Sequence, residues 1–300
     1  MSQLVFIGVL FVIGWLLQKN KHFPDNSVNI LNQYVIHISL PALILAKIPF
    51  LELDSNTWQP VALAWLSILS GALMVYIASR VFNWSREMTA AMLVVVPLGN
   101  TSFVGVPMIQ ALVGEEGVPI AILFDQLGSF LALIFYGSWI ISWYKKDPDS
   151  NAIGKQVFKK IALFPPFWSM LLAFIFAPFL QDSYLNDPLR LVGDTLVPVV
   201  VIALGMQFKI KLPSGNLQPL LTGLSIKLVL MPAIVFFVVG VLGWSGMPIH
   251  VSILESAMAS MISAGAIVLA AGIAKDLVAA LVSWGLIISF ITVPILNGLL

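Results

Sequence analysis

The chain has 300 residues, of which 59% are hydrophobic and only 10% are charged, and its mean hydropathy is +0.99. Soluble domains carry about 25% charged residues, so this composition predicts a polytopic membrane protein with little soluble mass. The formal net charge is +1 and there is no basic tract, so nucleic acid is not an expected partner. Cysteine is absent, which excludes disulfides and thiolate metal sites.

Apolar runs separated by polar residues predict an all-α protein with ten membrane-spanning helices. Their approximate limits are 3–18, 28–46, 58–79, 88–112, 117–143, 161–180, 188–207, 217–242, 249–273 and 277–298. A helix rises about 1.5 Å per residue, so the first run is short for a hydrocarbon core of about 30 Å and the fifth is long enough to tilt. No basic region precedes the first run and no cleavage site follows it, which predicts a spanning helix and not a signal peptide.

The basic residues of the connecting loops indicate the orientation of these helices. Loops after even-numbered spans hold only Lys47 and Arg190. Loops after odd-numbered spans hold Lys19, Lys21, Arg80, Arg86, Lys145, Lys146, Lys155, Lys159, Lys160, Lys209, Lys211 and Lys275. The positive-inside rule therefore predicts a plasma-membrane protein (inner membrane if bacterial) with both termini outside the cytoplasm.

A basic cytoplasmic loop at about 147–160 divides the chain into two groups of five spans, in 1–146 and 161–300. An odd number of spans per half forces the halves into opposite orientations, which is the inverted repeat of many transporters. Internal similarity is faint: Pro41 and Pro198 each lie within the second span of their half.

The fourth span holds an unusual run from Pro97 through Gly99-Asn100-Thr101-Ser102 to Pro107. Proline lacks an N–H donor, and glycine lets the backbone leave helical geometry at little steric cost. Broken helices survive in a membrane only where they face protein or a watery cavity, and many secondary transporters build their sites from them. The run therefore favours a broken helix, with a kinked but continuous helix as the alternative.

Several stretches resemble the auxin efflux carrier family, which includes plant PIN-formed auxin transporters and many bacterial organic-acid carriers. These stretches are Leu40-Pro41-Ala42-Leu43, the run from Gly99-Asn100-Thr101 to Gly105-Val106-Pro107, Lys227-Leu228-Val229-Leu230-Met231-Pro232, and residues 281–294. The resemblance implies two inverted five-helix repeats, related to the bile-acid/sodium symporters. The family usually has a proline near residues 258–259, and here Ala259 stands there. Whether the ninth span is broken thus stays open at this point.

The resemblance also implies a division of labour among the spans. Spans 1, 2, 6 and 7 would form a scaffold that usually dimerises, and spans 3–5 and 8–10 would form a moving transport domain. A small organic anion would bind where the fourth and ninth spans cross. Carried over by position, Asn100 would lie near the substrate carboxylate, beside Pro97 and Pro107.

Neutral polar residues near this crossing are the expected substrate ligands. Asn100, Thr101 and Ser102 offer donors without the cost of charge, and the N–H groups at the start of a half-helix suit a carboxylate. The alternative role is to satisfy backbone groups freed by the break. Gln33 faces either the substrate cavity or a neighbouring helix. The predicted set is completed by Ser260 and Ser263 of the ninth span.

Three ionisable residues, Asp125, Lys227 and Glu255, fall inside the predicted transport domain. An Asp, Lys or Arg at a helix centre costs about 2.5–3.5 kcal/mol, so each requires an explanation. A carboxylate near a lysine can hold a proton or exchange it for a cation, which would couple transport to H⁺ or Na⁺. The alternatives are a structural ion pair that neutralises Lys227, which we prefer for this lysine, and a direct contact of Lys227 with the substrate.

These features predict a secondary carrier of small organic anions that works by elevator-like alternating access. The sequence holds no Walker motif and no H-E-x-x-H motif, so neither ATP-driven transport nor an enzyme is expected, and no cofactor or metal is predicted. The alternative is a sodium- or proton-coupled symporter of the bile-acid type. A membrane ligand sensor fits less well, because no signalling domain is attached. The expected partners are the anion, the lipid bilayer and a second copy of the chain.

Overall fold

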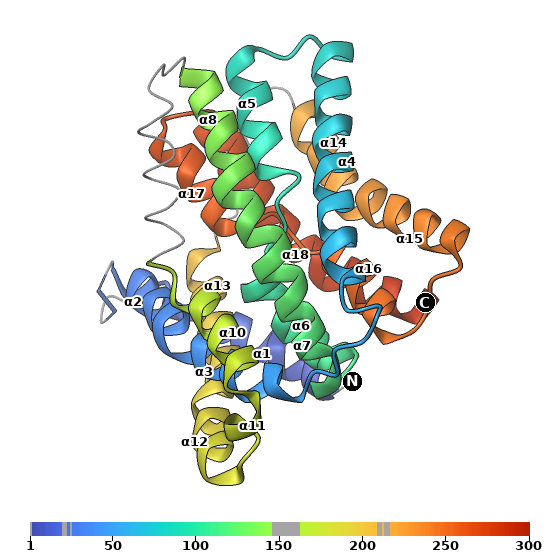
Figure 1. Ribbon diagram of the computed structural model, residues 1–300. Helices are drawn as coiled ribbons and strands as arrows, with labels where there is room; N and C mark the ends of the chain where they lie inside the picture. Colours follow the sequence, from blue (N-terminus) through green and yellow to red (C-terminus); the bar gives the residue numbers. More distant parts are fainter. Residues whose placement is uncertain (1, 20–22, 25, 146–162, 209–211, 213–216) are drawn as a thin grey trace.

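The computed structural model describes residues 2–19, 23–24, 26–145, 163–208, 212 and 217–300, and within these ranges it is helical with no strand (Figure 1). Six continuous helical segments are long and apolar enough to cross a membrane: Ser27–Phe50, Gln59–Val81, Glu115–Tyr144, Ser183–Gln207, Gln218–Leu242 and Lys275–Leu299. Three shorter apolar helices are Gln3–Leu17, Thr101–Leu112 and Pro165–Ile175. The predicted polytopic helical membrane protein is confirmed, whereas the ten-span topology stays a prediction.

Part of the predicted charge pattern lies outside the described residues. This holds for the basic loop at 147–160 and for Lys21, Lys146, Lys155, Lys159, Lys160, Lys209 and Lys211.

The first half of the chain forms helices that are often interrupted by short tighter or wider turns. Its elements are α1 (Ser2–Leu17), α2 (Ser27–Tyr34), η1 (Val35–Ser39), α3 (Leu40–Lys47), η2 (Ile48–Phe50), α4 (Gln59–Val81), α5 (Arg86–Val95), η3 (Thr101–Gly105), α6 (Val106–Leu112), η4 (Glu115–Gly117), α7 (Val118–Leu123), η5 (Phe124–Phe130), η6 (Leu133–Gly137) and α8 (Ser138–Lys145).

The second half of the chain also forms helices, one of which is interrupted by a short π-helical turn. Its elements are α10 (Pro165–Ile175), α11 (Ala177–Leu180), α12 (Ser183–Gly193), α13 (Leu196–Gln207), α14 (Gln218–Ser225), η7 (Ile226–Leu230), α15 (Met231–Leu242), α16 (Met247–Ser256), α17 (Ile262–Ala270) and α18 (Lys275–Leu299). Five of the short elements are π-helical turns: η3 begins a helix, and η1, η5, η6 and η7 lie inside longer helices. Such π turns are frequent at functional sites, and here they carry Thr101, Asp125 and Lys227.

Two groups of helices pack within the molecule. In one group α1 packs on α13, and α3 packs on both α10 and α12. In the other, α4 packs on η5, α15 and α16, and α18 packs on α14 and α17. In Figure 1, α4, α5, α8 and α14 extend together toward one end of the molecule, and α11 and α12 lie at the opposite end.

Two helices are interrupted in mid-course, and the interruptions meet. Helix α5 ends at Val95 and the chain becomes helical again at Thr101, while α16 ends at Ser256 and α17 begins at Ile262. The two extended stretches pair antiparallel in an isolated bridge between Gly99 and Ser260. The break predicted in the fourth span is therefore confirmed, and the helix in the ninth is broken as well.

This pairing explains why the second break forms without a proline at position 259. The Asn100 N–H donates to the Ala259 carbonyl at 2.8 Å, and the Met261 N–H donates to the Leu98 carbonyl at 2.8 Å. Buried backbone groups need partners, and each broken helix here supplies partners to the other. Pairing across the crossing thus replaces the local constraint that a proline would impose.

Candidate functional site

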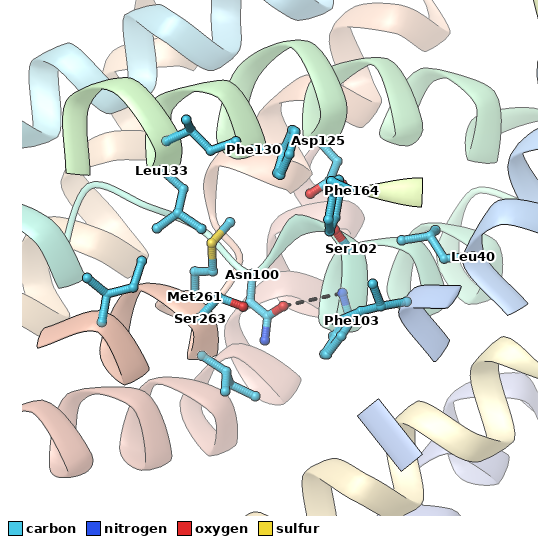
Figure 2. A pocket seen from close by; sticks show the side chains of 14 residues that line it. Leu40, Asn100, Ser102, Phe103, Asp125, Phe130, Leu133, Phe164, Met261 and Ser263 are labelled. Atoms are coloured by element: carbon cyan, nitrogen blue, oxygen red, sulfur yellow. Dashed lines mark hydrogen bonds between the residues drawn. The ribbon is translucent and has the colours of Figure 1, made fainter. Parts of the chain in front are cut away.

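A cavity of about 250 Å³ lies at the crossing of the two interrupted helices. Its walls are formed by Ile36, Leu40, Asn100, Ser102, Phe103, Asp125, Phe130, Leu133, Ile134, Phe164, Met261, Ile262, Ser263 and Ile267. In Figure 2, Asn100 and Met261 of the two interrupted helices point into it from one side, and the helix that carries Asp125 and Phe130 runs along the other side. None of the described lining residues carries a positive charge, so an anion bound here would rely on neutral donors and helix ends.

Asn100 is the best-anchored polar residue of this wall. Its N–H pairs with Ala259 across the crossing, and its carbonyl accepts from the N–H groups of Val104 and Gly105 at 3.2 and 3.0 Å. Its side-chain Oδ1 caps the next helix by accepting from the Phe103 N–H at 3.3 Å (Figure 2). The acceptor Oδ1 is engaged in this cap. The Asn100 side chain can therefore offer a ligand its Nδ2 group, which is a hydrogen-bond donor.

Two helix N-termini begin at the wall of the same cavity. One helix starts at Thr101 directly after Asn100, and α17 starts at Ile262 directly after Met261. The first N–H groups of a helix have no acceptor within the helix, and the helix dipole places partial positive charge there. Together these features form a site suited to a small anion.

Asp125 lines the cavity from the π turn η5 and is only 2% exposed. The Thr101 hydroxyl donates to its Oδ1 at 2.5 Å, and the Gln126 Nε2 donates to its Oδ2 at 2.7 Å. Thr101 therefore contacts a wall residue, Asp125, and is not itself among the described lining residues. The carboxylate is thus held by neutral donors, without a cationic partner at ion-pair distance among the described residues.

Lys227 and Glu255 lie behind the crossing and are 2% and 0% exposed. The Lys227 Nζ donates to the Ser256 carbonyl at 3.3 Å, at the C-terminal end of α16. Neither carboxylate oxygen of Glu255 has a hydrogen-bond partner among the described residues. The predicted ion pair of Lys227 is absent there, because the ammonium group binds the free carbonyl end of a helix instead.

Two glycines of the fourth-span run act through space and not through unusual dihedral angles. Gly105 has a helical φ of −62°, and a Cβ built on it would lie 2.6 Å from Oε1 of Glu255. A Cβ on Gly99 would lie 3.2 Å from the Lys227 Nζ. The expectation that glycine serves backbone freedom here is wrong for Gly105, which instead lets the helix approach a buried carboxylate.

The structure separates the predicted site residues into two sets. The cavity brings together Asn100, Ser102, Asp125 and Ser263, with Thr101 behind them. Pro97 is buried in the interruption, and Ser260 is buried in the bridge; neither is among the described lining residues.

Two further predicted residues lie away from the cavity. Pro107 stands in the first turn of α6 and lines a different cavity of about 290 Å³ beside Gln3 and Asp194. Gln33 is exposed on α2, where its carbonyl accepts from the His37 ring. Pro107 lies beyond the first turn of the new helix, so it is outside the described cavity wall. Gln33 shares a helical segment with the lining residues Ile36 and Leu40, but it is not itself a described lining residue.

The apolar part of the wall was not predicted from the sequence. Phe103, Phe130 and Phe164 line the cavity, and the rings of Phe130 and Phe164 stack with centroids 3.9 Å apart. Apolar residues are expected throughout a membrane span, so nothing in their sequence pattern distinguishes a cavity wall from a lipid-facing side. The partner of Asp125, Gln126, was also missed, although its amide directly follows a buried carboxylate in the sequence.

Comparison with known proteins agrees with these features. The membrane transport protein family matches residues 1–297. An uncharacterized transporter of Methanothermobacter thermautotrophicus is 24% identical over 294 residues, which cover 96% of this chain and 94% of that protein. An uncharacterized transporter of Methanocaldococcus jannaschii is 25% identical over 270 residues, which cover 87% and 85% of the two chains. The chain therefore belongs to the membrane transport protein family, the auxin-efflux-carrier-like family that its sequence resembles, and it is a transporter and not an enzyme.

Proposed function

We propose that this protein is a secondary carrier of small organic anions and that the anion binds at the crossing of the two interrupted helices. One observation carries the proposal: two helix N-termini and the Asn100 side chain meet at a single cavity without a described cationic lining residue. Neutral donors and helix dipoles hold an anion less tightly than an arginine pair would. A carrier needs this moderate affinity, since it must release its substrate on the other side.

The wall favours a carboxylate with a compact apolar body. Donors gather where the two helices begin, at Asn100, Ser102 and Ser263, and most of the remaining lining is aliphatic or aromatic. The carboxylate would lie against the helix starts, and the apolar body would pack on side chains such as Phe130 and Leu133. In most pockets of this kind a few polar groups fix the orientation of the ligand. A cavity with donors at one place and an apolar remainder therefore fits a range of small carboxylic acids.

We further propose ten spans arranged as two inverted repeats, with an elevator-like motion between two bodies. The scaffold would comprise the spans of α1, α2–α3, α10–α11 and α12–α13, and would dimerise. The remaining helices would form the transport domain. The cavity is lined from both sides, by Ile36, Leu40 and Phe164 of the scaffold and by Asn100 and Met261 of the transport domain. Sliding of one body along the other would thus carry the site across the plasma membrane, with both termini outside.

A second candidate function is symport coupled to protons or sodium. The observation that favours it is Glu255, whose buried carboxylate has no described hydrogen-bond partner and lies against Gly105 of the fourth-span run. A buried carboxylate without a partner is costly and is retained in membranes mainly where an ion or proton binds. Dependence of anion binding on sodium would favour this candidate over a simple carrier.

The test is ligand-induced thermal stabilisation of purified protein with monocarboxylates, dicarboxylates and indole-3-acetate, with and without sodium. Asn100→Asp keeps an oxygen that can cap the Phe103 N–H but adds a negative charge to the wall, so it should fold and lose the stabilisation. Asn297→Asp is the matched control, because Asn297 contacts His250 and is not a described lining residue of the cavity. Equal stabilisation of Asn100→Asp and wild type would contradict the site, and no response of wild type to any acid would contradict the anion carrier.

A further inference from the structure

Asp125 presents a problem for the proposed anion site. Its carboxylate lines the same cavity as Asn100 and Ser102 and is 2% exposed. An ionised carboxylate in this wall would repel a substrate carboxylate at close range, in a low-dielectric environment where charges interact strongly. When two carboxylates share such a site, the arrangement with one proton between them is favoured over the doubly charged one.

The surroundings of Asp125 provide little positive charge to remove this repulsion. The elements that pack most extensively on η5 are α4, α7, η3, α10 and η6. Their described residues include one charged group, Arg80 in the last turn of α4, and two titratable phenols, Tyr76 of α4 and Tyr136 of η6. Behind the crossing, Glu255 is a second buried carboxyl group, and it brings no positive charge. The ammonium group of Lys227 binds the Ser256 carbonyl and has no ion pair among the described residues with Asp125. An anion that enters would therefore meet the Asp125 carboxylate with no described cation beside it to offset the repulsion.

The hydrogen-bond partners of Asp125 suit a group that gains and loses a proton. Thr101 Oγ1 lies 2.5 Å from Oδ1, and a hydroxyl can both donate and accept. It donates to the ionised carboxylate and accepts from the protonated acid, with the heavy atoms in the same positions. The Ser102 hydroxyl also interacts with this carboxylate and, like Thr101, can donate or accept. Gln126 Nε2 donates to Oδ2 in either state. The network accommodates both protonation states without rearrangement, unlike an arginine partner, which would fix the ionised form.

We propose that Asp125 takes up one proton each time the cavity binds its anion, so that the carrier moves substrate and proton together. The proposal rests on the anion carrier proposed above. The step is a protonation: an O–H bond forms on the Asp125 carboxylate, the proton comes from solvent, and no other bond breaks. The site then has the same net charge when it is empty and when it is loaded, so both forms meet a similar electrostatic cost in the membrane.

The proposal predicts proton uptake on binding, measured on the wild-type protein. Isothermal titration calorimetry with benzoate, indole-3-acetate and succinate, in buffers of different ionisation enthalpy, counts the protons taken up per anion bound. We expect uptake of about one proton per anion bound. At pH values where Asp125 of the empty protein is ionised, the affinity for the anion should fall by up to about tenfold for each unit that the pH rises. Binding with no proton uptake and no pH dependence overturns the proposal and leaves the anion carrier standing. Absence of binding by all three acids overturns both.

Three variants identify the residue that holds the proton. Asp125→Asn retains the shape of the neutral acid, so it should bind the anion at all pH values with no proton uptake. Asp194→Asn is the matched control, since this exposed carboxylate is not among the described lining residues, and its proton uptake should equal that of wild type. Glu255→Gln should also retain uptake. Uptake that disappears in Glu255→Gln but persists in Asp125→Asn would overturn the assignment. If Asp125→Asn does not fold, the wild-type measurement together with Glu255→Gln still decides the question.

Discussion

At the scale of single residues, the crossing depends on close approaches that only small side chains permit. Gly105 packs directly on the Glu255 carboxylate, and Gly99 lies against the Lys227 ammonium group. Both contacts bring backbone up to a buried charged group. A side chain at either position would have to displace that group from a densely packed interior, which has a substantial cost.

We therefore expect Gly105→Ala to destabilise the protein by about 1–3 kcal/mol, because the added methyl group overlaps the Glu255 carboxylate. The measurement is the thermal unfolding midpoint of the purified protein. Gly240→Ala is a matched control within α15: its Cβ would meet nothing within 4 Å, so alanine should be neutral or slightly stabilising. Combining Gly105→Ala with Glu255→Ala removes the clashing group and should recover part of the loss. A midpoint for Gly105→Ala equal to that of wild type would show that the carboxylate moves aside freely.

At the scale of the elements, the second broken helix is stabilised by its partner and not by its own sequence. Its extended stretch pairs with the fourth-span run on both sides of the Gly99–Ser260 bridge. The Ala259 carbonyl accepts a hydrogen bond, whereas no partner of its N–H is described. A proline at this position would lose no described hydrogen bond.

Ala259→Pro should accordingly fold with a stability close to that of wild type. Ala266→Pro is the matched control, because position 266 lies inside α17, where proline removes a helical hydrogen bond and clashes with the preceding turn. That change should cost about 3 kcal/mol or more. Circular dichroism during heating compares the two variants. A loss in Ala259→Pro as large as that in Ala266→Pro would mean that the break tolerates only the geometry of a non-proline residue.

The elements also show how far the sequence predicts this protein. The apolar runs and the Pro-Gly-Asn run of the fourth span identify membrane helices and a break, because both follow from local chemistry. The sequence leaves the break near Ala259 undecided, because the break is caused by pairing with residues about 160 positions away, which local sequence does not reveal. Gln33, for which the sequence offers either the substrate cavity or a neighbouring helix, lies exposed on α2. Composition alone does not reveal which face of a helix meets a cavity.

At the scale of the whole molecule, one ion pair joins the two proposed bodies within the described ranges. Lys47 at the end of α3 pairs with Glu115 at the start of η4, and Gln110 donates to the same carboxylate at 2.6 Å. Both partners line a cavity of about 730 Å³ that also includes Arg190. The Glu115 side chain is 46% exposed, and ion pairs this exposed contribute only about 0–1 kcal/mol. Such a pair is weak enough to open in every transport cycle.

If the two bodies slide past each other, Lys47 and Glu115 must separate. The chain lacks cysteine, so Lys47→Cys combined with Glu115→Cys places the only two thiols of the protein at this contact. Bridging them with a short bis-methanethiosulfonate reagent should abolish carboxylate uptake into liposomes, because the scaffold and the transport domain can no longer separate. Reduction of the bridge should restore uptake.

A bridge within the transport domain controls for damage by the reagent. Trp84 and Gln218 are joined by a hydrogen bond of 3.0 Å and both belong to the proposed moving body, so the Trp84→Cys and Gln218→Cys pair should transport equally well with and without the bridge. Calorimetry on the bridged Lys47→Cys and Glu115→Cys protein should still detect anion binding, since the substrate cavity has none of its described lining residues at this contact. Full uptake by the bridged protein would rule out relative sliding of the two bodies as the transport step. If the bridged protein lost both uptake and anion binding, the bridge would be acting by damaging the binding site and not by blocking the motion.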